Sequence, residues 1–542
     1  MIKNFTALAA LALGFPIQAF AEPASLPPPS PPLPASQLDV GPDIGSLSAQ
    51  LSTGTFTSAD LVSFYIERNR AIDDSGPRIN AVSQLYSDAM EVAQRLDAER
   101  AAGHLRGPLH GIPILIKDNI EAVGSLATTA GSLALIDNVT GRDSPLVARL
   151  RVAGAIILGR TNLSEWAGYR GNGSTEGWSA MWGLTRNPYS LDRTACGSSA
   201  GSGAAIAASL GAAAIGTETY GSIVCPSGTN GIVGFRPTVG LVSRRYIVPI
   251  SHSQDTAGPM TQTVRDAALI LSVIAGTDPD DPATADADAQ RTDYAAALHA
   301  DALREMRIGV MRDRVGSSPA ILALLDSAVA TLRAQGATIV DIADSGIDDG
   351  KAISAAVFTV LPTEFKVGLN AYLAALPHAT ARTPRSLAQL IAFNRNEQRE
   401  LIWFGQELFE AAEANEALES EAHRTARATA QRLAGRDGID RLLRDNQVDL
   451  LLGVTNGPAS AIDLVHGDTH RGPGSTQLPA IAGYPHLTVP MGLVHGLPVG
   501  LSFIGTRWDD ARVLAAGNGF ELATINSRAR PSYRPSIDQP AL

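Results

Sequence analysis

The chain has 542 residues, of which 45% are hydrophobic and 18% charged, so it can bury the core of a large globular protein. Its formal charge of −11 argues against a nucleic-acid partner or an anionic membrane surface, either of which would need a basic stripe. No run of 18 or more apolar residues occurs, and we therefore expect no membrane span.

The N-terminus has the pattern of an export signal. Lys3 supplies a short positive region, residues 5–17 are apolar, and residues 19–21 (AFA) match an A-x-A cleavage site. We predict a signal peptide over residues 1–21, and hence a secreted or periplasmic protein. Residues 22–38 are rich in proline and predict an extended spacer rather than part of a core.

Helix and strand patterns alternate from residue 39 onward. The segment TSAD at 57–60 is a helix-capping signal ahead of an amphipathic run. Further on, the patterns predict a helix over 85–102, a strand within 111–119 (GIPILIKDN), a helix over 144–152 and a strand over 155–159. More β-type runs follow at 307–311, 337–342, 448–454, 486–492 and 498–505. The alternation predicts an α/β fold whose sheet is covered by helices.

We expect one folded domain over residues 39–530. Within it, residues 384–447 are charged and helical in pattern, and we predict that they form a helical lobe over one side of the site. Residues 531–542 lack a periodic pattern and are expected to be a loose tail.

Lys117 ends the apolar run 111–119, and its placement is unusual in this chain. Beyond the signal peptide, lysine occurs only at 117, 351 and 366, whereas arginine is abundant. A buried lysine can lose its proton, which an arginine cannot, so Lys117 could act as a neutral general base. The alternative is a lysine at a strand end whose ammonium group reaches water.

Residues 196–237 form a segment dense in glycine and alanine. Ser198 and Ser199 open a run of small residues that predicts a close-packed helix, and a serine at a helix start is often only a cap. Residues 197–201 also match G-x-S-x-G, the nucleophile elbow of α/β-hydrolases, centred on Ser199. We disfavour the elbow because turn-like sequence, rather than a strand, precedes it.

Ser222 lies in the same segment, in GTETYGSIVCP, after a short apolar run and before the helix-breaking Pro226. A serine on such a turn faces the adjacent cleft. The backbone N–H groups of residues 219–222 (Thr219, Tyr220, Gly221 and Ser222) could converge on an oxyanion, where each donor is worth about 3–4 kcal/mol. The sequence therefore offers Ser222 as a nucleophile beside an oxyanion hole.

Two cysteines, Cys196 and Cys225, flank these serines. We favour two small buried thiols, and a single bridge between them is the alternative in an oxidising compartment. No Cys/His cluster with metal-ligand spacing is present in the sequence, and we expect His252 and His486 to have packing roles. We therefore expect neither a metal nor a cofactor.

Taken together, Lys117 in GIPILIKDN, Ser198 in CGSSAGS and Ser222 in YGSIVCP resemble the amidase signature family. The resemblance extends over about residues 45–525 and is strongest to bacterial peptide amidases, through SIVCP and the segments at 185–202, 391–398 and 403–412. It implies the amidase signature fold, in which a large mixed central β-sheet is covered by helices on both faces.

The resemblance also implies a mechanism. Ser222 attacks the amide carbon, and Ser198, preceded by a cis peptide bond in the family, relays the proton to neutral Lys117. Ser199 and Asp118 are expected to support the triad by hydrogen bonds. Two positions depart from the family pattern, because Tyr220 replaces a common glycine and Glu218 a common aspartate. These departures put substrate preference in question more than reaction type.

The function that follows is a serine-type hydrolase of linear amides, with C-terminal peptide amides as the expected substrates and ammonia as a product. Small aryl or aliphatic amides are the close alternative. An exported amide- or peptide-binding protein without catalysis is the alternative of another class. A tRNA-linked amidotransferase component is disfavoured by the predicted export signal. We expect no nucleic-acid or membrane partner. We expect the protein to be a monomer.

Overall fold

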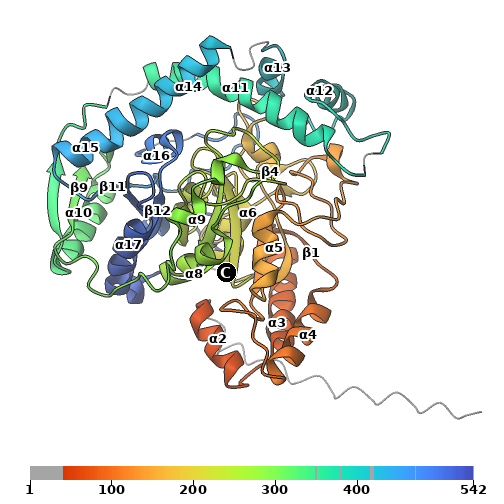
Figure 1. Ribbon diagram of the computed structural model, residues 1–542, viewed down its shortest axis with the longest axis horizontal. Helices are drawn as coiled ribbons and strands as arrows, with labels where there is room; N and C mark the ends of the chain where they lie inside the picture. The colour runs from red at the N-terminus through yellow and green to blue at the C-terminus, as the bar shows by residue number, and fades with distance from the viewer. Residues whose placement is uncertain (1–40, 348–350, 379, 416–419, 470–471, 541–542) are drawn as a thin grey trace, which may run out of the picture. The chain divides into compact units, whose positions relative to one another are not determined.

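The computed structural model describes residues 41–347, 351–378, 380–415, 420–469 and 472–540 (Figure 1). The predicted signal peptide and the whole of the predicted spacer lie outside the described residues. The strands are β1 Val82–Leu85, β2 Pro113–Lys117, β3 Ile156–Thr161, β4 Trp178–Ser179, β5 Gly183–Leu184, β6 Ala213–Glu218, β7 Val233–Arg236, β8 Thr256–Thr261, β9 Arg307–Met311, β10 Thr338–Ile342, β11 Leu450–Val454, β12 His486–Val494 and β13 Leu497–Ile504. The helices are α2 Ile44–Ser52, α3 Ser58–Arg68, α4 Ala89–Ala101, α5 Pro145–Val152, α6 Ala200–Ala207, α7 Val224–Thr229, α8 Val264–Ile274, α9 Ala287–Gln290, α10 Pro319–Ala334, α11 Lys351–Ala374, α12 Leu387–Asn396, α13 Glu407–Glu413, α14 Glu421–Ala434, α15 Asp440–Asp445, α16 Gln477–Ala482 and α17 Asp510–Thr524.

Eleven strands form one mixed sheet in the order β1-β3-β2-β6-β8-β7-β12-β13-β11-β9-β10. The pairs around β2 and β9 are parallel, and the middle of the sheet, from β6 through β8, β7, β12 and β13 to β11, is antiparallel. The predicted α/β fold with a large mixed sheet is confirmed. Each of the predicted strands is present within a residue or two of its expected place.

Helices cover both faces of this sheet. Leu487 of β12 packs against Gly517 of α17, whereas the next residue, Thr488, lies with Gly500 beside Gly228 of α7. Because successive side chains of a strand point to opposite faces, α17 and α7 lie on opposite sides of the sheet. Helices α5, α8, α17 and α10 contact one another in series, and α6 contacts α7.

The start of α3 shows why the early elements could be read from sequence. Thr57 accepts a hydrogen bond from the backbone N–H of Asp60, and the Asp60 carboxylate accepts one from the backbone N–H of Thr57. This reciprocal cap satisfies two of the N–H groups that a helix start leaves open.

All residues of helix α6 are buried, and all except Ile206 are small. At Gly201 a side-chain Cβ would lie 2.2 Å from the carbonyl oxygen of Ala81 and 2.5 Å from that of Asn162. Glycine is required there because the helix backbone lies against Ala81, just before β1, and Asn162, just after β3. The close packing predicted for the small-residue run is therefore present.

A helical lobe, defined here as α11 to α14, runs along one edge of the molecule in Figure 1. The sequence predicted a helical lobe over 384–447, and the structure adds α11 before it, a 24-residue helix that contains Pro362. Phe365, Leu369 and Phe409 form the core of the lobe. Helix α11 is long and apolar enough by composition to cross a membrane, but its buried face makes it the core helix of the lobe.

Residues 531–540, expected as a loose tail, lie along the loop at 188–191. Tyr533 donates its backbone N–H to Pro188, and Leu191 donates to the carbonyl oxygen of Arg534. The Ser532 hydroxyl and the Arg534 guanidinium both donate to the carbonyl oxygen of Tyr189. Backbone and side-chain hydrogen bonds therefore hold residues 532–534 against this loop.

Candidate active site

Lys117 occupies the last position of β2, a strand whose five residues are all buried. Its Nζ lies 2.7 Å from Ser198 Oγ, 2.9 Å from Thr217 Oγ1 and 3.2 Å from the Thr217 carbonyl oxygen. The parallel pairing of β2 with β6 brings Thr217 to the lysine, since Ile116 lies opposite Ile215. In the sequence, Lys117 is 81 residues from Ser198 and 100 residues from Thr217, and the fold brings all three into contact.

Burial of Lys117 lowers the pKa of its ammonium group from 10.5 to about 7, and the more distant Glu218 and Asp255 carboxylates offset this only in part. Among the described residues, Lys117 forms no ion pair. A lysine in this position is available as an unprotonated amine near neutral pH. The alternative of an ammonium group that reaches water does not fit a fully buried side chain.

Ser198 follows a cis peptide bond between Gly197 and Ser198, as the resemblance implied. Its carbonyl oxygen accepts a hydrogen bond of 3.0 Å from the backbone N–H of Ser164. The side chain is nearly inaccessible, and its hydroxyl lies against Lys117. Ser198 is thus placed between the buried amine and the segment that carries Ser222.

Ser222 lies on the turn between β6 and α7, and it is partly exposed. Gly221 has a φ of +81°, a conformation that favours glycine and lets the chain reverse just before Ser222. The backbone N–H of Ser199 donates to the Ser222 carbonyl oxygen over 3.2 Å, which fastens the two serine segments together. The Ser222 hydroxyl has no hydrogen-bond partner in the part of the chain that the structure describes, so it is open to the cleft.

Four consecutive backbone N–H groups around this turn are open. Those of residues 219–222 donate to no acceptor among the described residues. Tyr220 is exposed and Ser222 partly exposed, so N–H groups on this turn are accessible to a bound molecule. A run of them next to a serine hydroxyl can bind an oxyanion.

Glu218 holds the turn in place, a role that the sequence did not reveal. Its carboxylate accepts hydrogen bonds from the backbone N–H groups of Ile223, at 2.7 Å, and Val224, at 3.1 Å. The same carboxylate lies 3.1 Å from the Arg236 guanidinium, and both side chains are fully buried. Glu218, which stands where the family commonly has aspartate, therefore supports the turn, and it also lines a cavity beside it.

Ser199 and Asp118, the two residues expected to support the triad, form hydrogen bonds with different parts of the structure. The Ser199 hydroxyl donates to the Thr217 carbonyl oxygen at 3.1 Å, so it supports the strand that faces Lys117. Its burial and engagement do not fit an exposed nucleophile. The Asp118 carboxylate instead accepts hydrogen bonds from Thr129 and Trp182 and lies 3.5 Å from Arg160. It therefore has no direct contact with the lysine amine in the described structure.

Thr217 and Asn119 belong to the site although the sequence reading missed them. Asn119 Nδ2 donates to Thr217 Oγ1 over 3.0 Å, which orients the hydroxyl beside Lys117. Nothing in the local sequence marks Thr217, because its role depends on strand pairing. Of the two histidines considered from the sequence, His486 is buried against Ser502, whereas His252 is half exposed near Glu364 and lines the cavity that Asn119 and Thr217 also line.

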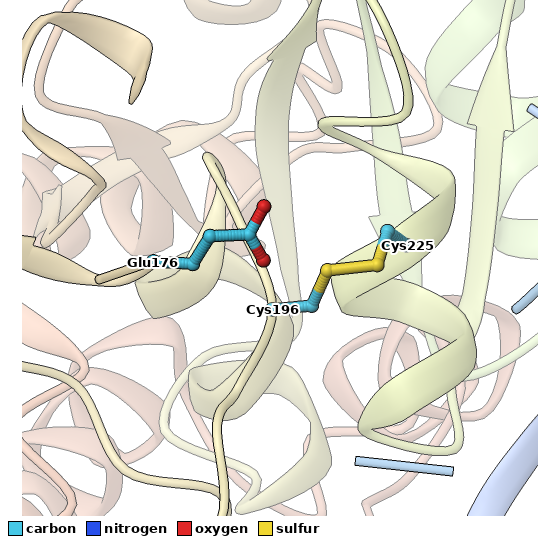
Figure 2. Close-up of side chains that lie close together, drawn as sticks. All are labelled: Glu176, Cys196 and Cys225. Carbon is cyan, nitrogen blue, oxygen red and sulfur yellow. A yellow bond between two sulfur atoms is a disulfide. The ribbon is translucent and has the colours of Figure 1, made fainter. Parts of the chain in front are cut away.

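The cysteines form a disulfide, and the expectation of two free thiols is wrong (Figure 2). The fold brings the Cα atoms of Cys196 and Cys225 to 6.0 Å, within bonding range although 29 residues separate them. Figure 2 also shows the Glu176 carboxylate directed toward the two sulfur atoms. These three form the one cluster of potential metal ligands among the described residues, but bonded sulfurs are not thiolate ligands.

Two cavities flank the turn. One, of about 360 Å³, is lined by Gly197, Tyr220 and Gly221, among others. The other, of about 230 Å³, is lined by Asn119, Thr217 and further residues. Cavity space therefore adjoins residues 217–221, immediately before Ser222.

Comparisons with known proteins show what this chain is similar to as a whole. The family model described as Amidase matches residues 60–514. A probable amidase of Arabidopsis thaliana is 37% identical over 484 residues, 86% of this chain and 87% of that protein. A glutamyl-tRNA(Gln) amidotransferase component of Rhodopirellula baltica is 33% identical over 522 residues, 90% of this chain and 98% of that one.

Solved structures give a similar result. Native peptide amidase from Stenotrophomonas maltophilia superposes with a TM-score of 0.87 at 46% identity, covering 92% of this chain and 100% of that chain.

Proposed function

Because the chain belongs to the amidase signature family and is an amide-hydrolysing enzyme, we propose that it acts on C-terminal peptide amides, releasing a free acid and ammonia. The choice of substrate rests on the likeness to peptide amidase over nine tenths of the chain. The chemistry rests on one observation above all, the 2.7 Å contact between the buried Lys117 amine and Ser198.

The surroundings of Lys117 match the bonding capacity of a neutral amine, which has two N–H donors and one lone pair. The two Thr217 oxygens accept the two N–H donors, and the lone pair then faces the Ser198 hydroxyl. An amine in this state accepts the Ser198 proton as a general base. A protonated lysine would have no lone pair for this step.

Acylation begins when Ser222 Oγ attacks the amide carbon. The Ser222 proton passes to Ser198 Oγ while the Ser198 proton passes to Lys117 Nζ. The carbonyl oxygen becomes an oxyanion that the open N–H groups of residues 219–222 bind. When the C–N bond breaks, the proton returns through Ser198 to the leaving nitrogen, and ammonia departs.

Deacylation repeats these steps with water in place of Ser222. Water attacks the ester carbon of the acyl-enzyme and gives its proton to Lys117 through Ser198. The bond to Ser222 Oγ then breaks, the proton returns to that oxygen, and the acid is released. Each proton that Lys117 accepts is returned within the same half-reaction, so the enzyme ends each cycle unchanged.

We also propose that the protein is exported, with residues 1–21 as its signal peptide. The Cys196–Cys225 disulfide supports this location, because such bonds persist in oxidising compartments and are rare in the cytosol. Fractionation of the producing cells and N-terminal sequencing of the mature protein test it. A cytosolic protein that retains residue 1 would refute the proposal.

A substrate panel tests the activity. Ammonia release is measured with amidated dipeptides, with the same dipeptides as free acids, and with small aryl amides. We expect turnover of the amidated dipeptides and none of the free acids. Faster turnover of the aryl amides would indicate a small-amide hydrolase, and binding without turnover would indicate a binding protein.

The nucleophile is tested separately with a fluorophosphonate probe, which reacts with activated serines. We expect labelling of the wild type and of Ser199→Ala, and no labelling of Ser222→Ala. A backbone hydrogen bond joins Ser199 to Ser222, so Ser199→Ala is a matched control from the same part of the site. Labelling that requires Ser199 instead would support the elbow arrangement.

A further inference from the structure

The larger cavity adjoins the two serine segments, although its described lining residues do not include Ser198 or Ser222 themselves. Gly197 and Gly221, which line it, immediately precede Ser198 and Ser222. Its volume of about 360 Å³ is in the range of small-molecule sites in proteins. A substrate whose carbonyl carbon is at Ser222 would therefore have part of its structure in this space.

Tyr220 is the only aromatic residue among the described residues that line this cavity. The other described lining residues have small or polar side chains, among them Thr194, Thr229, Asn456, Ala459 and Thr476. The Tyr220 side chain is 44% exposed and forms no hydrogen bond with another described residue. The Tyr220 ring is therefore the one large aromatic group in a described lining of small or polar side chains.

The position of Tyr220 in the chain places it close to where a substrate carbonyl would be held. Tyr220 lies on the turn whose four N–H groups are open, two residues before the Ser222 hydroxyl. Ammonia, as the leaving group, needs little room, whereas the acyl group is the larger part of a peptide amide. A space of this size beside the turn therefore fits the acyl group.

We propose that Tyr220 is a specificity-determining residue, whose ring packs against the side chain of the residue that carries the amide and favours aromatic side chains there. This inference rests on the proposed function and adds the substrate class to it. Aromatic pairs gain free energy beyond the apolar area they bury, so an exposed ring next to empty space is a strong contact for a second ring. In the described wall of the cavity, no other side chain offers such a contact.

The cavity also contains a carboxylate, that of Glu176, whose backbone N–H donates to Asp468. An acidic wall could instead prefer a basic side chain. We favour the aromatic partner because Tyr220 stands on the catalytic turn itself. The basic partner is included as an arm of the test.

The test is the ratio of kcat/KM for N-acetylphenylalaninamide to that for N-acetylglycinamide. We expect the wild type to prefer the phenylalanine amide, Tyr220→Ala to lower the ratio about tenfold, and Tyr220→Phe to keep it. A ratio cancels any shared loss of rate from disturbance of the turn. An unchanged ratio in Tyr220→Ala overturns the proposal, as does a preference for N-acetyllysinamide that Glu176→Gln abolishes.

Equilibrium binding separates this inference from the proposed function. The same amides are titrated into Ser222→Ala and into Ser222→Ala with Tyr220→Ala. A tenfold loss in the ratio of dissociation constants supports Tyr220 as a contact for the aromatic group even if the wild type hydrolyses neither amide. Equal ratios in the two variants overturn the assignment whether or not the wild type is active.

Discussion

Replacing Lys117 by methionine tests whether the buried Lys117 amine is neutral near pH 7. The substitution affects both turnover and the pH dependence of stability, so the test does not depend on loss of activity alone. Methionine has a similar length and no charge, so it fills the site without a titrating group. We expect turnover to fall about 10²- to 10⁴-fold, the usual contribution of a general base. In the wild type, the rate should rise with pH through about 7, as the amine loses its proton.

The same substitution has a consequence for stability that depends on pH. Between the folded pKa of about 7 and the ordinary value of 10.5, the unfolded chain binds a proton at Lys117 that the folded chain does not. Raising the pH across this range therefore favours the folded state, by up to about 1.4 kcal/mol per pH unit. Methionine has no such proton, so the stability of the wild type relative to Lys117→Met should increase by about 2 kcal/mol from pH 7 to pH 9.

Urea denaturation of both proteins at pH 7, 8 and 9 measures this difference. Lys366→Met is the matched control, because Lys366 lies partly exposed on α11 and donates to the Glu413 carbonyl oxygen, far along the chain from the site. A wild-type advantage that stays constant from pH 7 to pH 9 would refute the lowered pKa of Lys117. The proton relay would then lack its base at neutral pH.

Three further substitutions probe the rest of the site. Ser198→Ala should lower kcat by about 10²- to 10⁴-fold with little change in KM, and a normal kcat in steady-state assays would exclude the relay. Glu218→Gln should lower the free energy of unfolding by about 3–5 kcal/mol, because it leaves the Arg236 charge buried without its partner, and an unchanged thermal midpoint would contradict this. Cys225→Ser should cost about 3–4 kcal/mol in urea denaturation, from the freed 29-residue loop, and equal stability of the variant and the oxidised wild type would argue against the cross-link.

The elements that could be predicted from the sequence are those set by local chemistry. The capped start of α3 and the apolar run of β2 each carry their signal within a few residues. The position of Lys117 at the end of β2 followed from that run. Ser198 and Ser222 could be placed near each other only through the family resemblance, since the hydrogen bond that joins their segments, from Ser199 to Ser222, connects the start of α6 to the turn after β6.

The features that were missed depend on contacts between distant parts of the chain. Thr217 meets Lys117 through the pairing of β2 with β6, which no local pattern indicates. Glu218 was noticed only as a departure from a family pattern, and its partner Arg236 lies on another strand. The disulfide likewise depends on the distance between Cys196 and Cys225 in the fold.

The close packing of α6 constrains how this enzyme can change during evolution. A side chain at Gly201 would collide with two backbone carbonyl oxygens, and the other residues of the helix are equally enclosed. Random substitutions in α6 should therefore be removed by selection whatever the substrate. New substrate preferences are instead expected at positions such as Tyr220, whose exposed side chain lines the cavity beside the turn.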